Sequence, residues 1–151
     1  MSAVTPLPLP TPPAAAPAPE RLVIVVDEAL APGLAANAAS VVAFTLGAQL
    51  PALRGPDVPD ANGAVLPGFI PIGVPILRAP AGALVALHAH AVAGGLGVVA
   101  LPTFGHQTND YEEFRELVAR TPGSDLRFLA VALHGPRRPI SRLTGSFALL
   151  R

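Results

Sequence analysis

The residues best suited to chemistry lie between positions 103 and 110, where the chain reads Thr-Phe-Gly-His-Gln-Thr-Asn-Asp. His106 is a histidine, the residue type used most often as a general acid or base, so it could act as either. Thr108 offers a hydroxyl close by, and Gln107 and Asp110 offer side chains that can hydrogen-bond a ligand. The segment is expected to follow a strand and to open a helix, which is a common position for sites in α/β proteins.

A second polar pair occurs in the apolar segment that follows the first expected strand. Asn37 and Ser40 lie three residues apart, so they share one face if this segment is helical. Asn37 could then orient a ligand, although a buried amide that satisfies a neighbouring backbone group is an equally simple interpretation. The candidate site residues are, for catalysis, His106 and Thr108 and, for ligand binding, Asn37, Ser40, Gln107 and Asp110.

No metal and no cofactor is predicted. The chain has no cysteine, which excludes disulfides, thiolate catalysis and cysteine-ligated metals. His88 and His90 are two residues apart in an expected helix, so their side chains point in different directions and cannot bind one ion together. The sequence contains no P-loop, no Gly-x-Gly-x-x-Gly and no Ser-His-Asp arrangement.

The composition limits the classes of partner. Hydrophobic residues make up 51 % of the 151 residues and charged residues 13 %, with ten arginines balancing ten acidic residues and no lysine. A neutral chain has no general attraction to nucleic acid or to an anionic membrane, so neither is expected as a partner. No segment reaches about 18 uninterrupted apolar residues. The expected partner is a small molecule or a protein, and the expected location is the cytoplasm.

The chain divides into a Pro/Ala-rich leader, 1–20, and one domain, 21–151, in which expected strands alternate with expected helices. The leader has little apolar surface to bury and is expected to be disordered. The strands are expected at 22–26, 72–77, 98–101, 126–133 and, as a short last strand, 146–150. The helices are expected at 33–49, 81–94 and 108–120, with a single helical turn at 139–143. This order predicts an α/β layered domain with a largely parallel or mixed sheet.

Several local features refine these expectations. Asn62-Gly63 fits a tight primed turn, so a short hairpin is predicted in the turn-rich stretch 51–71. Pro75 lacks an N–H and therefore places the second strand at an edge or a bulge. Thr108 or Asn109 is expected to cap the helix at 108–120. The first helix is expected to carry its core-facing stripe on Leu34, Ala38, Val41 and Thr45.

Two stretches resemble the type II peptidyl-tRNA hydrolases. One is 23–44, a strand leading into a helix that carries Ala-Ala-Asn-Ala-Ala-Ser, and the other is the ending, with Gly135-Pro136 and then Ile-Ser-Arg-Leu-Thr-Gly at 140–145. More specifically, 21–151 resembles a branch of that superfamily, the domain of unknown function 2000. Pro-Gly-Leu-x-Ala-Asn after the first strand, Tyr-Glu-Glu-Phe at 111–114 and the Leu-Thr-Gly-Ser ending carry this resemblance.

The resemblance implies a three-layer α/β/α sandwich with a mixed four-stranded sheet. In those hydrolases a lysine, a polar helix residue and an aspartate act on the ester between peptide and tRNA. Their lysine corresponds to Gly33 here, their helix glutamine to Asn37, a nearby histidine to Ser40, and their aspartate to Pro102 or Thr103. Loss of a charged group from such a site commonly costs several kcal/mol of transition-state stabilisation, so no useful peptidyl-tRNA hydrolysis is expected.

Two functions from different classes remain as hypotheses. The first is a domain without peptidyl-tRNA hydrolase activity that binds a small ligand or a protein partner in the inherited cleft. The alternative is a hydrolase with altered chemistry that uses the loop from His106 to Asp110. The resemblance also allows a homodimer, because members of the superfamily often form dimers.

Overall fold

The computed structural model describes residues 18–151, so most of the predicted leader lies outside the described residues. The main sheet is formed by β1 (Arg21–Asp27), β4 (Ile76–Ala79), β5 (Gly97–Pro102), β6 (Phe128–Gly135) and β7 (Ala148–Leu149). The helices are α1 (Pro32–Gln49), α2 (Ala81–Ala93), α3 (Tyr111–Arg120) and α4 (Arg137–Thr144), with 3-10 turns at Pro51–Leu53, Thr103–His106 and Gly123–Asp125. No helix within residues 18–151 is long and apolar enough to cross a membrane.

The sheet is mixed, in the order β5-β6-β1-β4-β7. β1 pairs in parallel with β4 and antiparallel with β6, while β5 and β7 run antiparallel to their neighbours. β1 is central because its middle residues are apolar on both faces and fully buried. The expected α/β class is confirmed, but the sheet has five strands where the resemblance implied four, because β7 adds to β4.

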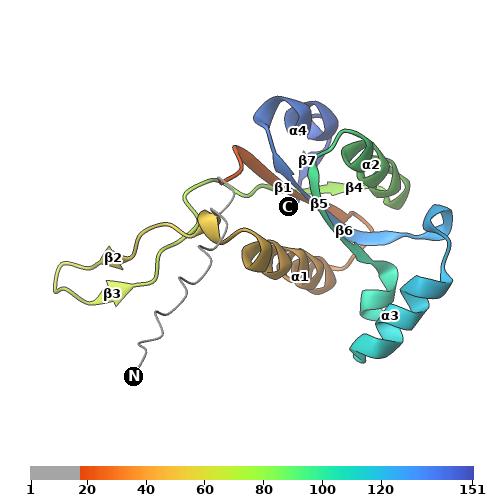
Figure 1. The fold of residues 1–151 in the computed structure, drawn as a ribbon, viewed down its shortest axis with the longest axis horizontal. Helices are drawn as coiled ribbons and strands as arrows, with labels where there is room; N and C mark the ends of the chain where they lie inside the picture. Colours follow the sequence, from red (N-terminus) through yellow and green to blue (C-terminus); the bar gives the residue numbers. More distant parts are fainter. Residues whose placement is uncertain (1–17) are drawn as a thin grey trace, which may run out of the picture.

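The helices form one layer on each face of the sheet (Figure 1). α1 packs over one face on a core that includes Ile24, Val42 and Leu46. α2 packs over the other face on Val25, Leu84 and their neighbours, and α4 adds Ile140 to this second core. Each strand therefore contributes alternate side chains to two separate cores, as the two-fold period of a strand requires.

The predicted core-facing stripe of α1 was wrong for three of its four residues. Of that stripe the structure buries Ala38, whereas Leu34, Val41 and Thr45 are exposed. The residues of α1 that face the core are Ala35, Ala38, Ala39, Val42 and Leu46. Apolar side chains occur on every side of this helix, so their periodicity did not indicate which side faces the core. The alanines on the buried side are small and let the helix lie close to the sheet.

The predicted second strand was displaced. It was expected at 72–77 and, because of Pro75, at an edge or a bulge, but β4 lies at Ile76–Ala79, between β1 and β7. Pro75 precedes the strand and contributes its carbonyl oxygen, which accepts a hydrogen bond of 3.1 Å from the backbone N–H of Ile24. A proline placed before the first residue of a strand costs no ladder bond, which is why it did not force an edge position.

The predicted hairpin is confirmed and forms an arm, defined here as residues 55–70. β2 (Val58–Pro59) and β3 (Val65–Leu66) pair antiparallel in a separate two-stranded sheet. The primed turn predicted at Asn62-Gly63 is not formed, because Asn62 does not adopt the positive φ that such a turn requires. The turn runs from Asp60 to Gly63, whose N–H donates to the Asp60 carbonyl oxygen at 3.1 Å. Gly63 itself has a positive φ of 85°, where glycine avoids the steric cost of a Cβ. The arm extends away from the body of the domain (Figure 1).

Candidate functional site

The structure brings together the two polar groups that the sequence placed far apart. His106, at the end of the 3-10 turn after β5, lies beside Asn37 on α1, with 3.3 Å between Nε2 and Oδ1. The contact spans 69 positions of the chain. The amide oxygen can only accept, so Nε2 carries the proton in this contact, and Nδ1 of a neutral His106 is left with a lone pair. Asn37 is exposed, and its amide oxygen contacts the His106 side chain. This excludes the alternative interpretation of Asn37 as a buried amide that satisfies a neighbouring backbone group.

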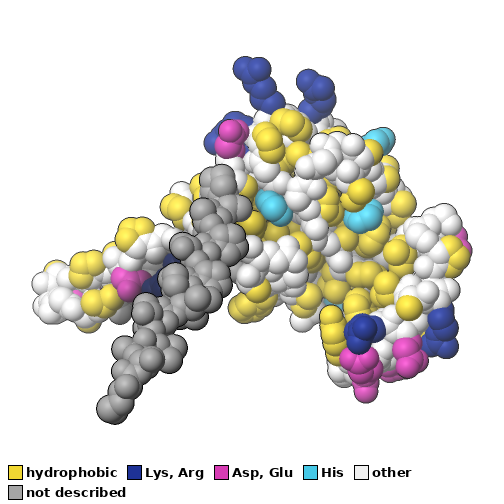
Figure 2. Space-filling view, in the orientation of Figure 1, with side chains coloured by type: hydrophobic (Ala, Val, Ile, Leu, Met, Phe, Trp, Pro, Cys, Tyr) yellow, Lys and Arg dark blue, Asp and Glu magenta, His cyan; other side chains and the backbone are white. Residues whose placement is uncertain are grey.

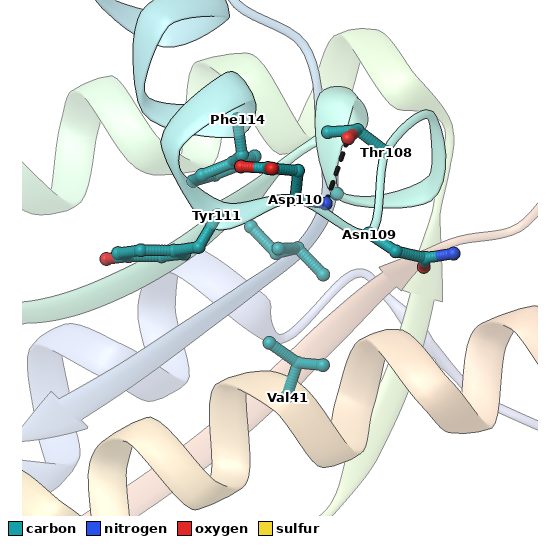
Figure 3. A pocket seen from close by; sticks show the side chains of 8 residues that line it. Val41, Thr108, Asn109, Asp110, Tyr111 and Phe114 are labelled. Carbon is teal, nitrogen blue, oxygen red and sulfur yellow. Dashed lines mark hydrogen bonds between the residues drawn. The ribbon is translucent and has the colours of Figure 1, made fainter.

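A pocket of about 210 Å³ lies next to this pair, between α1 and the start of α3. Figure 3 shows Val41 on α1 on one side, facing the segment that carries Thr108, Asn109 and Asp110 at the beginning of α3. Val41 is one helical turn beyond Asn37, so the histidine–asparagine pair borders the same part of the α1 surface. The lining residues are Val41, Leu101, Gly105, Thr108, Asn109, Asp110, Tyr111 and Phe114.

The pocket is apolar inside and polar along one rim. Leu101, Val41 and Phe114 supply the apolar walls, and the Tyr111 and Phe114 rings stack with their centroids 6.0 Å apart. Gly105 is needed for this close packing, because a Cβ there would come within 2.8 Å of the Leu101 side chain. No arginine lines the pocket, so it has no cationic side chain to hold a phosphate or carboxylate.

Thr108 and Asp110 are already engaged in building the start of α3. The Asp110 carboxylate accepts hydrogen bonds from the backbone N–H groups of Glu112 and Glu113, at 2.8 and 3.0 Å, and is the N-cap of the helix. The Thr108 hydroxyl accepts from the Asp110 N–H at 3.0 Å and donates to the Glu113 carboxylate. The prediction that Thr108 or Asn109 caps this helix was therefore wrong by one or two positions.

Ser40 and Gln107 are not part of the pocket lining. The Ser40 hydroxyl donates to the carbonyl oxygen of Ala36 at 2.8 Å, which is an ordinary bond for a serine within a helix. Gln107 is exposed, and its backbone N–H donates to Phe104 O at 2.9 Å. Of the candidate residues, Thr108 and Asp110 line the pocket. His106 and Asn37 contact each other beside the pocket without lining it, and Ser40 and Gln107 lie outside it.

The apolar half of the site was not predicted. Val41 was assigned to the core-facing stripe of the first helix, Leu101 to a strand, and Tyr111 and Phe114 only to the helix expected at 108–120. The available signal was the pair of aromatic residues at 111 and 114, which share a face at the start of an acidic helix. The sequence did not indicate that the side chains of Tyr111 and Phe114 would border an open pocket beside α1 and β5.

Two other histidines lie outside the site and are partly buried. Burial lowers the pKa of His88, whose ring lies 4.7 Å from the Phe128 ring, and burial also lowers the pKa of His134. The His134 ring lies where a Cβ on Gly97 would be, at 2.1 Å, so glycine is required opposite it. Within residues 18–151, no three His, Asp or Glu side chains gather as a metal site would require.

Comparisons with known proteins found one matching family and a similar solved structure. A family model described as "Protein of unknown function (DUF2000)" matches residues 20–151. The chain is similar to a solved structure of a protein of unknown function, Atu0240, from Agrobacterium tumefaciens strain C58, with a TM-score of 0.80 at 14 % identity, covering 87 % of this chain and 97 % of that one. At that identity the similarity supports the fold alone. Comparison with curated proteins gave no match.

Proposed function

The chain belongs to the DUF2000 family of proteins of unknown function, and from this premise we propose that it binds a small, uncharged, amphipathic molecule between α1 and α3. The observation that carries the proposal is the apolar pocket of about 210 Å³ bordered by the hydrogen-bonded pair of His106 and Asn37. Concave, largely apolar pockets with a few convergent polar groups are the usual form of small-molecule sites.

The volume limits the apolar part of the ligand to a single ring or a short branched chain. An apolar cavity of about 150 Å³ accommodates benzene, and drug-sized ligands occupy roughly 300 Å³ or more. At about 210 Å³ the pocket accepts a six-membered ring with one or two substituent atoms. A larger ligand would have to extend past the rim toward Asn37.

The rim favours a polar end that both donates and accepts hydrogen bonds. The Asn37 amide nitrogen and the His106 Nδ1 remain available after their mutual contact, as a donor and an acceptor. The ionisable residues that line the pocket are Asp110 and Tyr111, neither of which is cationic at neutral pH. An amide or a hydroxyl therefore suits the rim better than a carboxylate or a phosphate.

Benzamide and benzoate test this proposal, because they share a ring and differ in the charge of the polar end. We expect benzamide to shift the backbone NMR signals of 105–114 and of α1, with a millimolar dissociation constant equivalent to about −4 kcal/mol, and benzoate to bind more weakly. Val41→Trp fills the pocket and should abolish these shifts, while Val92→Trp, at an exposed position on α2, should leave them unchanged. Shifts that survive Val41→Trp would place the binding elsewhere and refute the proposal.

A hydrolase with altered chemistry is the second candidate, favoured by the contact between His106 and Asn37. An asparagine that fixes a histidine tautomer leaves the other ring nitrogen free to act as a general base. Within the described residues, however, neither Thr108 nor Asp110 hydrogen-bonds to His106, so a base with a bound water suits the geometry better than a protein nucleophile. Turnover of p-nitrophenyl acetate that is lost in both His106→Ala and Asn37→Ala would support this candidate.

We propose that this domain shares the peptidyl-tRNA hydrolase II-like ancestry but not its activity, because Gly33 stands where that family has its lysine and the chain contains no lysine at all. Gly33 is exposed and a side chain there would meet no atom within 4 Å. An assay with an N-acylaminoacyl-tRNA should therefore give no turnover, and robust turnover by the natural chain would refute this interpretation.

A further inference from the structure

The arm, residues 55–70, is an isolated hairpin with an unusual surface. Its two strands pair only with each other, in a sheet separate from the main one. A lone two-stranded hairpin is marginally stable in water, so its persistence calls for a further contact. Five large apolar side chains of the arm are exposed to solvent: Val58 at 46 %, Val65 at 62 %, Leu66 at 52 %, Phe69 at 69 % and Ile70 at 47 %.

The polar groups of the arm are largely satisfied within it. The Asp60 carboxylate accepts from the N–H groups of Asn62 and Ala64, each at 2.8 Å. At the base, Asp57 accepts from the Gly68 N–H at 2.9 Å and forms an ion pair with Arg54 at 2.7 Å. What the arm offers to a partner is therefore mainly apolar surface.

The outer face of α1 is the matching surface on the same chain. None of the 18 residues of α1 is charged, although its outer face is exposed. Phe44 is 83 % exposed, Leu34 is 48 % exposed and Val41 is 39 % exposed. A solvated helix face normally carries charged side chains, so an exposed face without any charge indicates a surface that is covered by a protein.

We propose that the arm of one copy packs across the outer face of α1 of a second copy, and that the two contacts form reciprocally in a two-fold symmetric dimer. The arm extends away from the body of its own domain (Figure 1), which leaves its apolar side chains available to another molecule. Figure 2 shows hydrophobic side chains along this arm, with few charged ones among them. Because each chain carries both halves of the contact, a two-fold arrangement satisfies both at once.

The dimensions agree with this arrangement. An arm of about seven residues per side is roughly 23 Å long at about 3.3 Å per residue, and α1 is about 27 Å long at about 1.5 Å per residue. With roughly 170 Å² for a fully exposed large apolar residue, the eight exposed side chains hold on the order of 750 Å² per copy. Stable interfaces bury about 800 Å² per partner, so these side chains with the adjoining backbone are sufficient.

A second copy fits these observations better than an unrelated protein, because the length and the apolar character recur on both surfaces of one chain, and the two carboxylates of the arm accept hydrogen bonds from the arm's own backbone. The dimer contact shares one residue, Val41, with the ligand pocket. Neither Phe44 nor any residue of the arm lines that pocket. A failure to bind benzamide would thus not contradict the dimer, and the absence of a dimer would not contradict ligand binding.

The absence of cysteine gives a clean test by cross-linking of the full chain. An isotope-labelled Val65→Cys variant is mixed with one of three unlabelled variants of α1: Phe44→Cys, Val41→Cys or Leu34→Cys. The mixture is oxidised, and mass spectrometry counts the disulfide dimers that contain one labelled and one unlabelled chain. We expect such dimers with at least one position of α1, and background levels with Val92→Cys on α2. Background levels at all three positions of α1 would overturn the proposal.

Sedimentation over a range of concentrations tests the interface without a cross-link. The natural chain should be dimeric, and the double change Val65→Ser with Phe69→Ser should weaken the dimer at least tenfold. Phe44→Ser, on the opposite half of the contact, should weaken it similarly, while Val92→Ser should have no effect. A natural chain that is monomeric at about 100 µM, or a dimer that none of these changes affects, would overturn the proposal. Circular dichroism of each variant separates loss of the dimer from loss of the fold.

Discussion

Removal of the carboxylate of Asp110 should loosen α3 without unfolding the domain. In Asp110→Ala, two hydrogen bonds to the backbone N–H groups of Glu112 and Glu113 are lost from the first turn of α3. Loss of an N-cap costs about 1 kcal/mol, which corresponds to about a fivefold change in an equilibrium constant. None of the ten residues of α3 is buried, so this helix can open independently of the two cores.

Amide hydrogen exchange measures this effect directly. We expect protection within α3 to fall about fivefold in Asp110→Ala, while the amides of β1 and β6 keep their protection. Asp110→Asn is the matched control, because asparagine caps a helix as well as aspartate does and should retain most of the protection. Equal losses in the two variants, or an equal loss in β6, would refute the argument that Asp110 acts as a local cap.

The same pair of variants separates the structural role of Asp110 from a role in ligand binding. Tyr111 and Phe114 line the pocket from α3, so opening of α3 should weaken benzamide binding in Asp110→Ala. Asp110→Asn keeps the cap and removes the charge, so binding should persist if the carboxylate only positions the helix. Loss of binding in Asp110→Asn together with intact α3 protection would instead assign the carboxylate to the ligand.

Three further predictions concern stability. Burial lowers the pKa of His88 and of His134 in the folded state, so the unfolded state binds more protons. The free energy of unfolding measured in urea should therefore fall as the pH drops below 6.5. Changing both histidines to glutamine should make this pH dependence weaker. Leu46→Ala should cost about 2–5 kcal/mol in urea unfolding because Leu46 is fully buried, whereas Val92→Ala, at an exposed position on α2, should cost under about 0.5 kcal/mol. Gly68→Ala would place a Cβ 1.9 Å from a backbone oxygen across the base of the arm, so NMR should show a disrupted arm and sedimentation should show a weakened dimer.

Local sequence patterns predicted the element order well. The strand expected at 22–26, the helix expected at 81–94 and the hairpin expected around Asn62-Gly63 each depend on short-range chemistry, and the structure contains all three. The errors arose where long-range packing decides. β7 completes the sheet through pairing with a strand about 70 residues earlier, and no local signal specifies that partner.

The site was predictable in part. The polar loop that follows β5 and the asparagine of α1 were recognised because polar groups among apolar neighbours are conspicuous. Their contact was not predictable, since it depends on where the end of β5 lies relative to α1. The capping role of Asp110 was not predicted, because a cap and a ligand-binding carboxylate look the same in sequence.

The sequence by itself determined the α/β class, the alternation of strands and helices, the hairpin, and the absence of lysine and cysteine chemistry. These follow from periodicity, turn residues and composition, which act over a few neighbouring positions. Only the tertiary structure decided which face of α1 is buried, that His106 meets Asn37, and that a pocket opens between α1 and α3. The physical reason is that hydrophobic contacts are not directional, so an apolar side chain does not specify which residue it packs against. The buried and exposed faces of α1 are therefore distinguished only when the sheet is in place.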